Sequence, residues 1–205
     1  MIKLVAFDLW RTLAYRDYPG GTFARICNET GINIGRKEYN RIYEETMQKR
    51  IWNSKEEAYA SLCRGLGINE ENSKKIMQIR DEAESKAKLF PHVLPMLAQL
   101  RKSYKIGLIS NTSVFAAEQL RQKTDLMDYI DFPVFSFDVG AAKPDPAIYL
   151  KALSLAGCKP EEAVMVGDSE DADVIAPRKL GMHAILYTDY ESLKKDFAVL
   201  GIFLE

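Results

Sequence analysis

The stretch KLVAFDLWRTL, residues 3–13, decides the fold of this chain. It begins after a single lysine as a continuous apolar run, which is the pattern of a strand buried on both faces of a parallel sheet. The run then meets a carboxylate, Asp8. Ligands of open α/β sheets bind beyond the carboxyl ends of the strands. Asp8 is therefore a candidate nucleophile or metal ligand as well as a candidate helix cap.

Strand-like and helix-like segments alternate through the second half of the chain. Further apolar strands are predicted at residues 105–111, 132–139, 163–168 and 183–187. Amphipathic helices are predicted at residues 91–103, 114–125, 146–156, 172–180 and 191–200. Strands that alternate with helices favour parallel pairing. We therefore expect an α/β fold with a Rossmann-like, doubly wound parallel sheet.

A different pattern separates the first strand from the others. From Thr22 to about Lys88 the apolar spacing is helical and no strand is predicted, while Tyr15 to Gly21 reads as a linker. Ser54 and Glu57 have the spacing of a capping box, and Gly31 is expected to end a helix. We expect a core of residues 1–14 plus 89–205 and an inserted all-helical cap of residues 15–88, suited to act as a lid.

The composition excludes several classes of protein. The 205 residues contain 28 Lys and Arg against 29 Asp and Glu, so no basic excess points to nucleic acid. No apolar run approaches the roughly 20 residues that a membrane-spanning helix needs. No secretory leader is recognisable, and the three cysteines lack a CxxC pair, so we expect free thiols and a cytoplasmic location. A monomer or a homodimer is expected.

Polar groups follow four of the predicted strands, and together they suit phosphate chemistry. They are Asp8, Thr12, Ser110, Asn111, Lys143, Asp168 and Asp173. The hydroxyls of Thr12 and Ser110 and the backbone N–H groups at Ser110 and Asn111 can hold phosphate oxygens. Lys143 supplies a compact positive charge for Asp8 and for the group being transferred.

An anionic nucleophile repels a phosphate, so a cation is required at the same place. Mg²⁺ prefers oxygen ligands, usually one or two carboxylates with waters and substrate phosphate. Asp8, Asp168 and the backbone carbonyl of Trp10 are the predicted ligands, and Asp173 is placed to orient a metal-bound water. Simpler roles remain open, because Ser110-Asn111 resembles an N-cap before Val114 and residues 168–173 resemble an acidic first helical turn.

Four motifs resemble those of the haloacid dehalogenase (HAD) superfamily. They are FDLWRTL at residues 7–13, LISN at 108–111, GAAKPDPAIY at 140–149 and VGDSEDAD at 166–173. The resemblance implies a Rossmann-like core with a helical cap inserted after the first strand. It also implies that Asp8 is a nucleophile forming an aspartyl-phosphate or an aspartyl ester, that Ser110 and Lys143 bind the transferring group, and that Asp168 binds Mg²⁺.

Trp10 departs from that pattern. Phosphatases of this superfamily usually carry an Asp two residues after the nucleophile, which protonates the leaving group and then activates water. Trp10 cannot transfer a proton, and Arg11 stands where a glycine is usual. An aromatic residue at this position is familiar from the 2-haloacid dehalogenases, and Tyr149 also suits that branch. Asp168 argues against that assignment, because the resemblance implies a serine there in those metal-independent enzymes.

The sequence therefore predicts a Mg²⁺-dependent phosphohydrolase that acts on a small phosphorylated metabolite. Two alternatives stay open: a metal-independent 2-haloacid dehalogenase and a phospho-ligand-binding protein without turnover. The cap is expected to set specificity. Its candidate contacts are Arg25, Arg41, Arg50 and Trp52.

Overall fold

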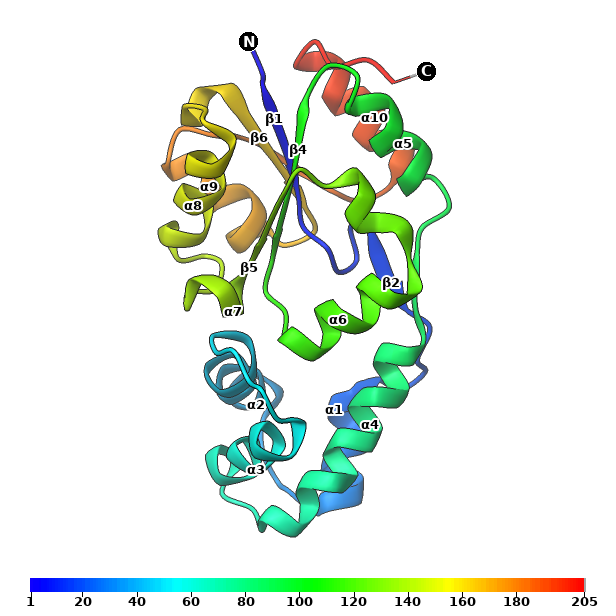
Figure 1. Ribbon diagram of the computed structural model, residues 1–205, viewed down its shortest axis with the longest axis vertical. Coiled ribbons are helices and arrows are strands. Elements are labelled where there is room, and N and C mark those ends of the chain that lie inside the picture. Colours follow the sequence, from blue (N-terminus) through cyan, green and yellow to red (C-terminus); the bar gives the residue numbers. More distant parts are fainter. Residues whose placement is uncertain (205) are drawn as a thin grey trace.

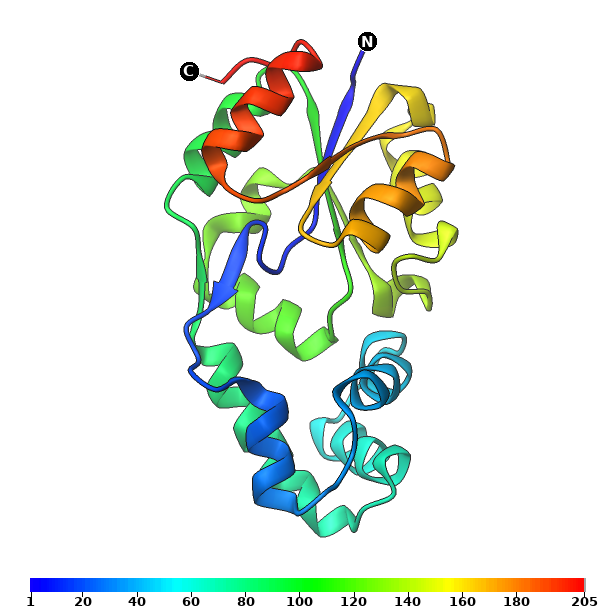
Figure 2. The ribbon, with the colours of Figure 1, turned by 180° about the vertical axis from the view of Figure 1, so that it is seen from behind.

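A central parallel sheet organises the molecule, of which a computed structural model describes residues 1–204. The strands run in the order β5-β4-β1-β6-β7, as Figures 1 and 2 show from opposite sides. They are β1 (Leu4–Phe7), β4 (Lys105–Ser110), β5 (Phe132–Phe135), β6 (Ala163–Gly167) and β7 (His183–Leu186). The opening strand β1 lies in the middle with every residue buried, and the predicted fold class is confirmed.

The two faces of β1 contact separate hydrophobic cores. Val5 and Phe7 belong to the core under α5 (Val93–Leu100), α6 (Val114–Lys123) and α10 (Tyr190–Val199). Leu4 and Ala6 belong to the core under α8 (Pro146–Ala156) and α9 (Ala176–Lys179). Figure 1 shows these two helix groups on opposite sides of the sheet. Burial on both faces explains why the strand reads as an uninterrupted apolar run.

Four helices between β1 and β4 pack around a hydrophobic cluster of their own. They are α1 (Gly21–Thr30), α2 (Arg36–Tyr43), α3 (Lys55–Leu66) and α4 (Ser73–Ser85). Gly31 ends α1 in a left-handed conformation, as the sequence predicts. Of the predicted capping box, one bond is present: the backbone N–H of Glu57 donates to Ser54 Oγ. We call residues 15–88 the cap.

The expectation that the insertion lacks strands is wrong at both of its ends. β2 (Ala14–Arg16) pairs antiparallel with β3 (Ala87–Leu89), and Tyr15 lies opposite Lys88 in this ribbon. The ribbon joins the cap to the core (Figure 2). Each strand has only three residues, which is too short for an alternating pattern to be recognised in a sequence.

The third predicted strand, residues 132–139, is longer than the strand in the structure. It ends at Phe135, and the chain turns into the short helix α7 (Ser136–Val139). The Ser136 hydroxyl accepts from the Thr112 N–H and donates to the Thr112 carbonyl, which holds the turn beside β4. Two further predicted helices contain π-helical turns, at Glu44–Gln48 after α2 and at Glu170–Ile175 before α9.

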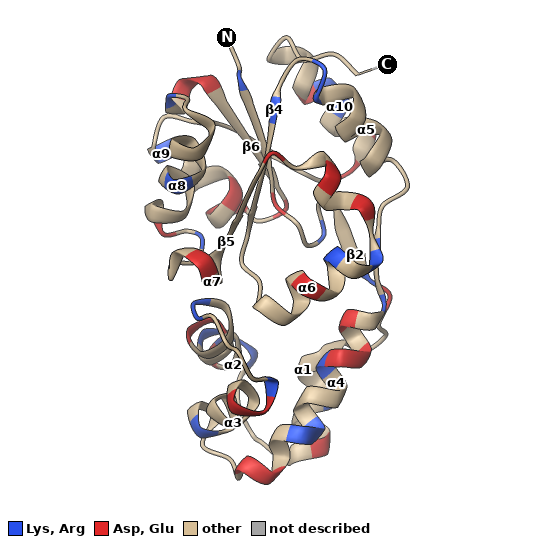
Figure 3. Cartoon of the chain, viewed as in Figure 1, with Lys and Arg blue, Asp and Glu red and all other residues tan. Residues whose placement is uncertain are grey.

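Contacts from the core fix the position of the cap. Phe115 of α6 belongs to the cap cluster, with its ring stacked 6.2 Å from that of Tyr59. Gln48 Nε2 donates to the Asn111 carbonyl over 3.1 Å, which ties the cap to the end of β4. Acidic and basic positions are interspersed along the cap helices and the core in Figure 3. Among residues 1–204, no helix has the length and apolarity needed to cross a membrane.

Candidate active site

A buried lysine links two carboxylates at the carboxyl end of β1. Lys143 Nζ lies 2.7 Å from Asp8 Oδ1 and 2.6 Å from Asp173 Oδ1. The side chains of Lys143, Asp8 and Asp173 are 3%, 10% and 1% exposed. Because the three charges are largely withdrawn from water, each depends on the others for compensation.

Burial sets the protonation of this cluster. It raises the pKa of Asp8 from 3.8 to about 6, with Lys143 opposing the shift and Asp173 adding to it. Burial alone would lower the pKa of Lys143, but the two carboxylates outweigh it and the pKa is raised overall. Asp8 is therefore an ionised carboxylate beside an ammonium group at neutral pH.

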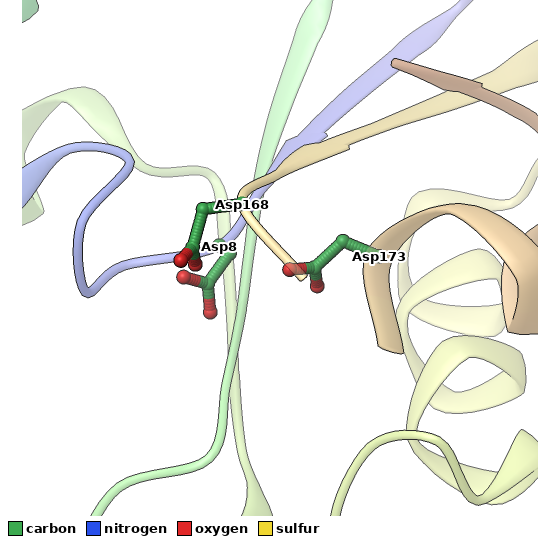
Figure 4. A group of neighbouring side chains, drawn as sticks. All are labelled: Asp8, Asp168 and Asp173. Atoms are coloured by element: carbon green, nitrogen blue, oxygen red, sulfur yellow. The ribbon is translucent and has the colours of Figure 1, made fainter. Parts of the chain in front are cut away.

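Three carboxylates point toward one space at this edge of the sheet, as Figure 4 shows. Oxygen atoms of Asp8, Asp168 and Asp173 all lie within 4.8 Å of one another. All three donors are the oxygen ligands that Mg²⁺ prefers, so the residues present fit a magnesium ion. A Cβ at Gly167 would overlap the Asp173 carboxyl group, so this glycine is required for Asp173 to lie against β6.

The Asn111 side chain binds the protein backbone. Its Nδ2 donates to the Lys143 carbonyl and its Oδ1 accepts from the Lys143 N–H, both over 2.8 Å. The side chain therefore holds the backbone of the Lys143 loop against the end of β4. A phosphate contact from Asn111 is left to its backbone N–H and remains a prediction.

The N-cap interpretation of Ser110-Asn111 is wrong, because Ser113 caps α6 by accepting from the Ala116 N–H. Ser110 Oγ and Thr12 Oγ1 are both buried without a hydrogen-bond partner within residues 1–204. Buried hydroxyls are rarely left unpaired unless a ligand or water satisfies them. Neither hydroxyl forms part of the cavity wall around Asp8.

The Trp10 side chain is fixed by two contacts. Its indole N–H donates to Thr112 Oγ1 over 3.4 Å, and the Arg16 guanidinium lies 3.3 Å from the ring centroid. The next residue, Arg11, has a left-handed backbone with φ of 69°, and its Nε lies 3.1 Å from Asp168 Oδ2. A guanidinium therefore approaches a predicted metal ligand, which the sequence did not indicate.

Trp10 lines two cavities. One of about 270 Å³ contains Asp8, Lys143, Asp168 and Asp173. The other, of about 350 Å³, lies between the cap and the core and is also lined by Trp10. We call this second space the cap cavity.

The cap residues predicted to meet substrate do not line either cavity described above. Arg25 pairs with Glu29 and Glu82, Arg41 pairs with Glu38, and the Trp52 indole donates to the Thr46 carbonyl. Arg50 is exposed. The arginines that do line the cap cavity are Arg16, Arg36 and Arg80.

Comparison with known proteins agrees with this geometry. The model of the haloacid dehalogenase-like hydrolase family matches residues 5–187. The chain belongs to this family. A glyceraldehyde 3-phosphate phosphatase of Methanopyrus kandleri is 30% identical over 198 residues, covering 89% of this chain and 82% of that protein.

Two solved HAD structures share the fold. A 2-haloacid dehalogenase of Pseudomonas syringae has a TM-score of 0.62 and 25% identity, over 93% of this chain and 90% of that one. A HAD enzyme of Bacteroides thetaiotaomicron, solved with magnesium and inorganic phosphate, has a TM-score of 0.67 and 20% identity, over 94% and 99% of the two chains. The protein is therefore a HAD-like hydrolase whose named relatives include phosphatases.

Tyr149 does not reach the reacting groups. Its ring is fully buried under the sheet, and its hydroxyl donates to the Ala172 carbonyl. This packing role is independent of whether the substrate is a phosphate ester or a haloacid.

Proposed function

We propose that this protein is a Mg²⁺-dependent phosphohydrolase that acts on a small phosphorylated metabolite through an aspartyl-phosphate on Asp8. The observation that carries the proposal is the pairing of Asp8 with Lys143 inside a group of three carboxylates. The phosphatase named among the relatives and the magnesium and phosphate bound by a protein of the same fold support the same reading.

In the first step Asp8 attacks the phosphorus. A bond forms between an Asp8 carboxylate oxygen and phosphorus while the bond from phosphorus to the leaving oxygen breaks. Lys143 stays protonated beside Asp8 Oδ1 and stabilises charge on the transferring group. Asp8, Asp168 and the Trp10 backbone carbonyl would hold Mg²⁺, which when bound offsets the repulsion between the carboxylate and the phosphate. Asp173, whose two oxygens already accept from Lys143 and from the Ser169 N–H, would orient a metal-bound water.

In the second step water attacks phosphorus, and Asp8 departs as a carboxylate. In phosphatases of this superfamily the residue two places after the nucleophile assists both steps. Here that residue is Trp10, whose indole N–H donates to Thr112. Since general acid and base assistance contributes roughly 10²–10⁴-fold, we expect efficient turnover only when the leaving group is stable as an anion, as in aryl and acyl phosphates.

A phosphate-release screen tests the proposal. Wild type and Asp8→Asn are compared on glyceraldehyde 3-phosphate, acetyl phosphate and para-nitrophenyl phosphate, each with Mg²⁺ and with EDTA. We expect release that requires both Mg²⁺ and Asp8. Release that survives Asp8→Asn, or that is unaffected by EDTA, contradicts the proposal.

One observation favours a second candidate, a 2-haloacid dehalogenase. Halide leaves without a proton, so the absence of an acid at Trp10 has no cost for that reaction. The group of three carboxylates argues against a dehalogenase, because dehalogenation by these enzymes needs no metal ion. Halide release from chloro- or fluoroacetate in the presence of EDTA would favour the dehalogenase over the phosphatase.

A further inference from the structure

The cap cavity contains three arginines that are each stacked on an aromatic ring. The guanidinium carbon lies 3.3 Å from the Trp10 centroid for Arg16, 4.6 Å from Tyr43 for Arg80, and 4.6 Å from Phe23 for Arg36. All three arginines line the same space. Arg16 and Arg80 also donate to Glu84. Arg36 makes no side-chain hydrogen bond within residues 1–204, so its N–H edge can bind an oxyanion in two-point geometry.

Buried polar groups without partners surround the same space. Tyr39 and Tyr43 line the cap cavity and are 3% and 6% exposed, and neither hydroxyl has a hydrogen-bond partner in residues 1–204. The Arg80 Nε is likewise buried and unpartnered there. Each such group costs free energy when it is buried unpaired. Two hydroxyl donors and a guanidinium N–H in one cavity indicate that a ligand with acceptor oxygens satisfies them.

The charge of the cap cavity is not cancelled by its surroundings. Arg16 and Arg80 share one carboxylate, Glu84. The acidic lining residue Glu44 is paired with Lys49 over 2.8 Å. Arg36 has no ion pair within the described part of the chain, residues 1–204. The cavity therefore carries a net positive charge and favours an anion.

The position of the cavity connects it to the reaction. Trp10 lines both the cap cavity and the cavity of Asp8 and Lys143. A substrate whose phosphate lies against Asp8 would extend past Trp10 with the rest of its structure. Trp10 supplies no proton there, so the leaving group departs as an anion unless another donor intervenes.

We propose that the cap cavity binds a second anionic group, a carboxylate or a phosphate, carried by the leaving-group part of the substrate. This inference rests on the proposed phosphohydrolase function. Arg16, Arg36 and Arg80 supply the charge, and the hydroxyls of Tyr39 and Tyr43 supply neutral donors. The substrate class is then a phosphorylated metabolite with an anion at its other end, not a phosphate ester with a neutral remainder.

Matched aryl phosphates test this specificity without needing a general acid. Para-carboxyphenyl phosphate is compared with para-carbamoylphenyl phosphate, which has the same shape without the charge, and para-phenylene bisphosphate replaces the carboxylate with a phosphate. Because a hydrogen bond to a charged acceptor is stronger than one to a neutral acceptor, we expect kcat/KM to be at least ~10-fold higher for the anionic members. Whichever of the carboxylate and the phosphate gives the larger increase in kcat/KM over the carbamoyl compound is the anion that the cavity prefers.

Two variants and one control locate the effect. Arg36→Gln and the double variant Tyr39→Phe/Tyr43→Phe should lower kcat/KM for the anionic compounds much more than for the carbamoyl compound, and so remove most of the preference. Arg41→Gln changes an exposed arginine of the same helix that is paired with Glu38, so its preference should equal that of wild type. A preference that survives both cavity variants contradicts the proposed site.

Failure of this inference is distinguishable from failure of the phosphohydrolase function. Equal hydrolysis of the charged and uncharged compounds overturns the anion site and leaves the function standing. If none of the compounds is hydrolysed, the function fails, and calorimetric titration with the carboxyl and carbamoyl compounds still tests the cavity. Equal affinity for the two then overturns the anion site as well.

Discussion

The carboxylate cluster at the strand ends and the arginine-lined cap cavity lie on either side of Trp10 and hold charge in opposite ways. In the cluster, Lys143 bonds directly to Asp8 and Asp173, and all three side chains are largely buried. In the cap cavity, guanidinium groups stack on aromatic rings, and two tyrosine hydroxyls lack partners among residues 1–204. The first region pairs its cation within the protein, whereas Arg36 and the two tyrosine hydroxyls of the second have no partner within residues 1–204, which is the role we propose for a ligand.

This difference determines how each region responds to substitution. Removing the Lys143 cation from the cluster leaves two carboxylates buried and uncompensated, so stability and activity should fall together. Removing the Tyr39 or Tyr43 hydroxyl from the cap cavity takes away a donor that has no partner within residues 1–204, so selectivity should change with little loss of stability.

The largest expected effect is that of Lys143→Met. It leaves Asp8 and Asp173 buried without their shared cation, and breaking a buried ion pair typically costs about 3–5 kcal/mol. Denaturant unfolding of the metal-free protein measures the loss. Lys151→Met, an exposed position on α8, is the control and should be near neutral. A Lys143→Met protein as stable as the control contradicts the compensation that we describe.

Trp10→Asp tests the boundary between the regions. A carboxyl group placed beside Asp8 can supply the missing acid and base, so turnover of alkyl phosphates should rise relative to aryl phosphates, by up to ~10²-fold. Trp10→Phe keeps an aromatic surface for Arg16 without adding a proton donor and should leave the ratio unchanged. An unchanged ratio in Trp10→Asp would show that proton transfer at this position does not limit the reaction.

The pH dependence of stability tests the burial of Asp8. Its pKa is about 6 in the folded protein and close to 3.8 when exposed. Below about pH 4 both states are protonated, and between these values the folded state keeps a proton that the unfolded state loses. The contribution of Asp8 to the free energy of unfolding of the metal-free protein should therefore fall as pH rises from about 4 to 6, which lowers Tm relative to a variant without this carboxyl group.

Asp8→Asn should weaken this dependence and raise Tm at neutral pH. Asp168, whose pKa is also raised by burial, keeps part of the dependence. Asp128→Asn, an exposed position, serves as the control. Thermal unfolding across pH is the measurement, and an Asp8→Asn curve that parallels that of wild type would show that Asp8 carries no such shift.

The smallest expected effect is that of Arg11→Gly. Glycine relieves a left-handed backbone, and its lack of a guanidinium removes a charge beside Asp168. Since the Arg11 side chain is 80% exposed, we expect Mg²⁺ affinity to rise only several-fold, consistent with the small energies of exposed ion pairs. Arg11→Lys retains a positive charge, so it separates the effect of the charge from that of the glycine backbone. Calorimetric Mg²⁺ titration gives the result, and weaker binding in Arg11→Gly would assign Arg11 a supporting role.

The sheet and the polar strand ends could be predicted because a doubly buried strand leaves a local signal. The run before Asp8 and the run before Asp168 are both continuous and apolar, and the carboxyl ends of parallel strands share one edge. That geometry brings Asp8, Lys143 and Asp168 together without information about side-chain contacts.

The cap cavity could not be predicted in the same way. Which arginines face the core depends on the packing of the cap helices and on the π-helical turn at Glu44–Gln48, which shifts the helical periodicity. Arg16 lies in a three-residue strand, and Arg80 pairs with Glu84 inside α4. The interpretation of Arg25 and Arg41 as substrate contacts rested on residue type, and their ion pairs become visible only in three dimensions.

The most direct test of the central claim is to find the phosphoryl group on Asp8. Wild-type protein with Mg²⁺ is mixed with para-nitrophenyl phosphate, quenched in acid during turnover and digested, and the peptide that contains Asp8 is analysed by mass spectrometry. Because Trp10 cannot activate water, the intermediate should accumulate, and we expect a phosphoryl group on that peptide in wild type and none in Asp8→Asn. Turnover without any phosphoryl group on the Asp8 peptide would contradict the account.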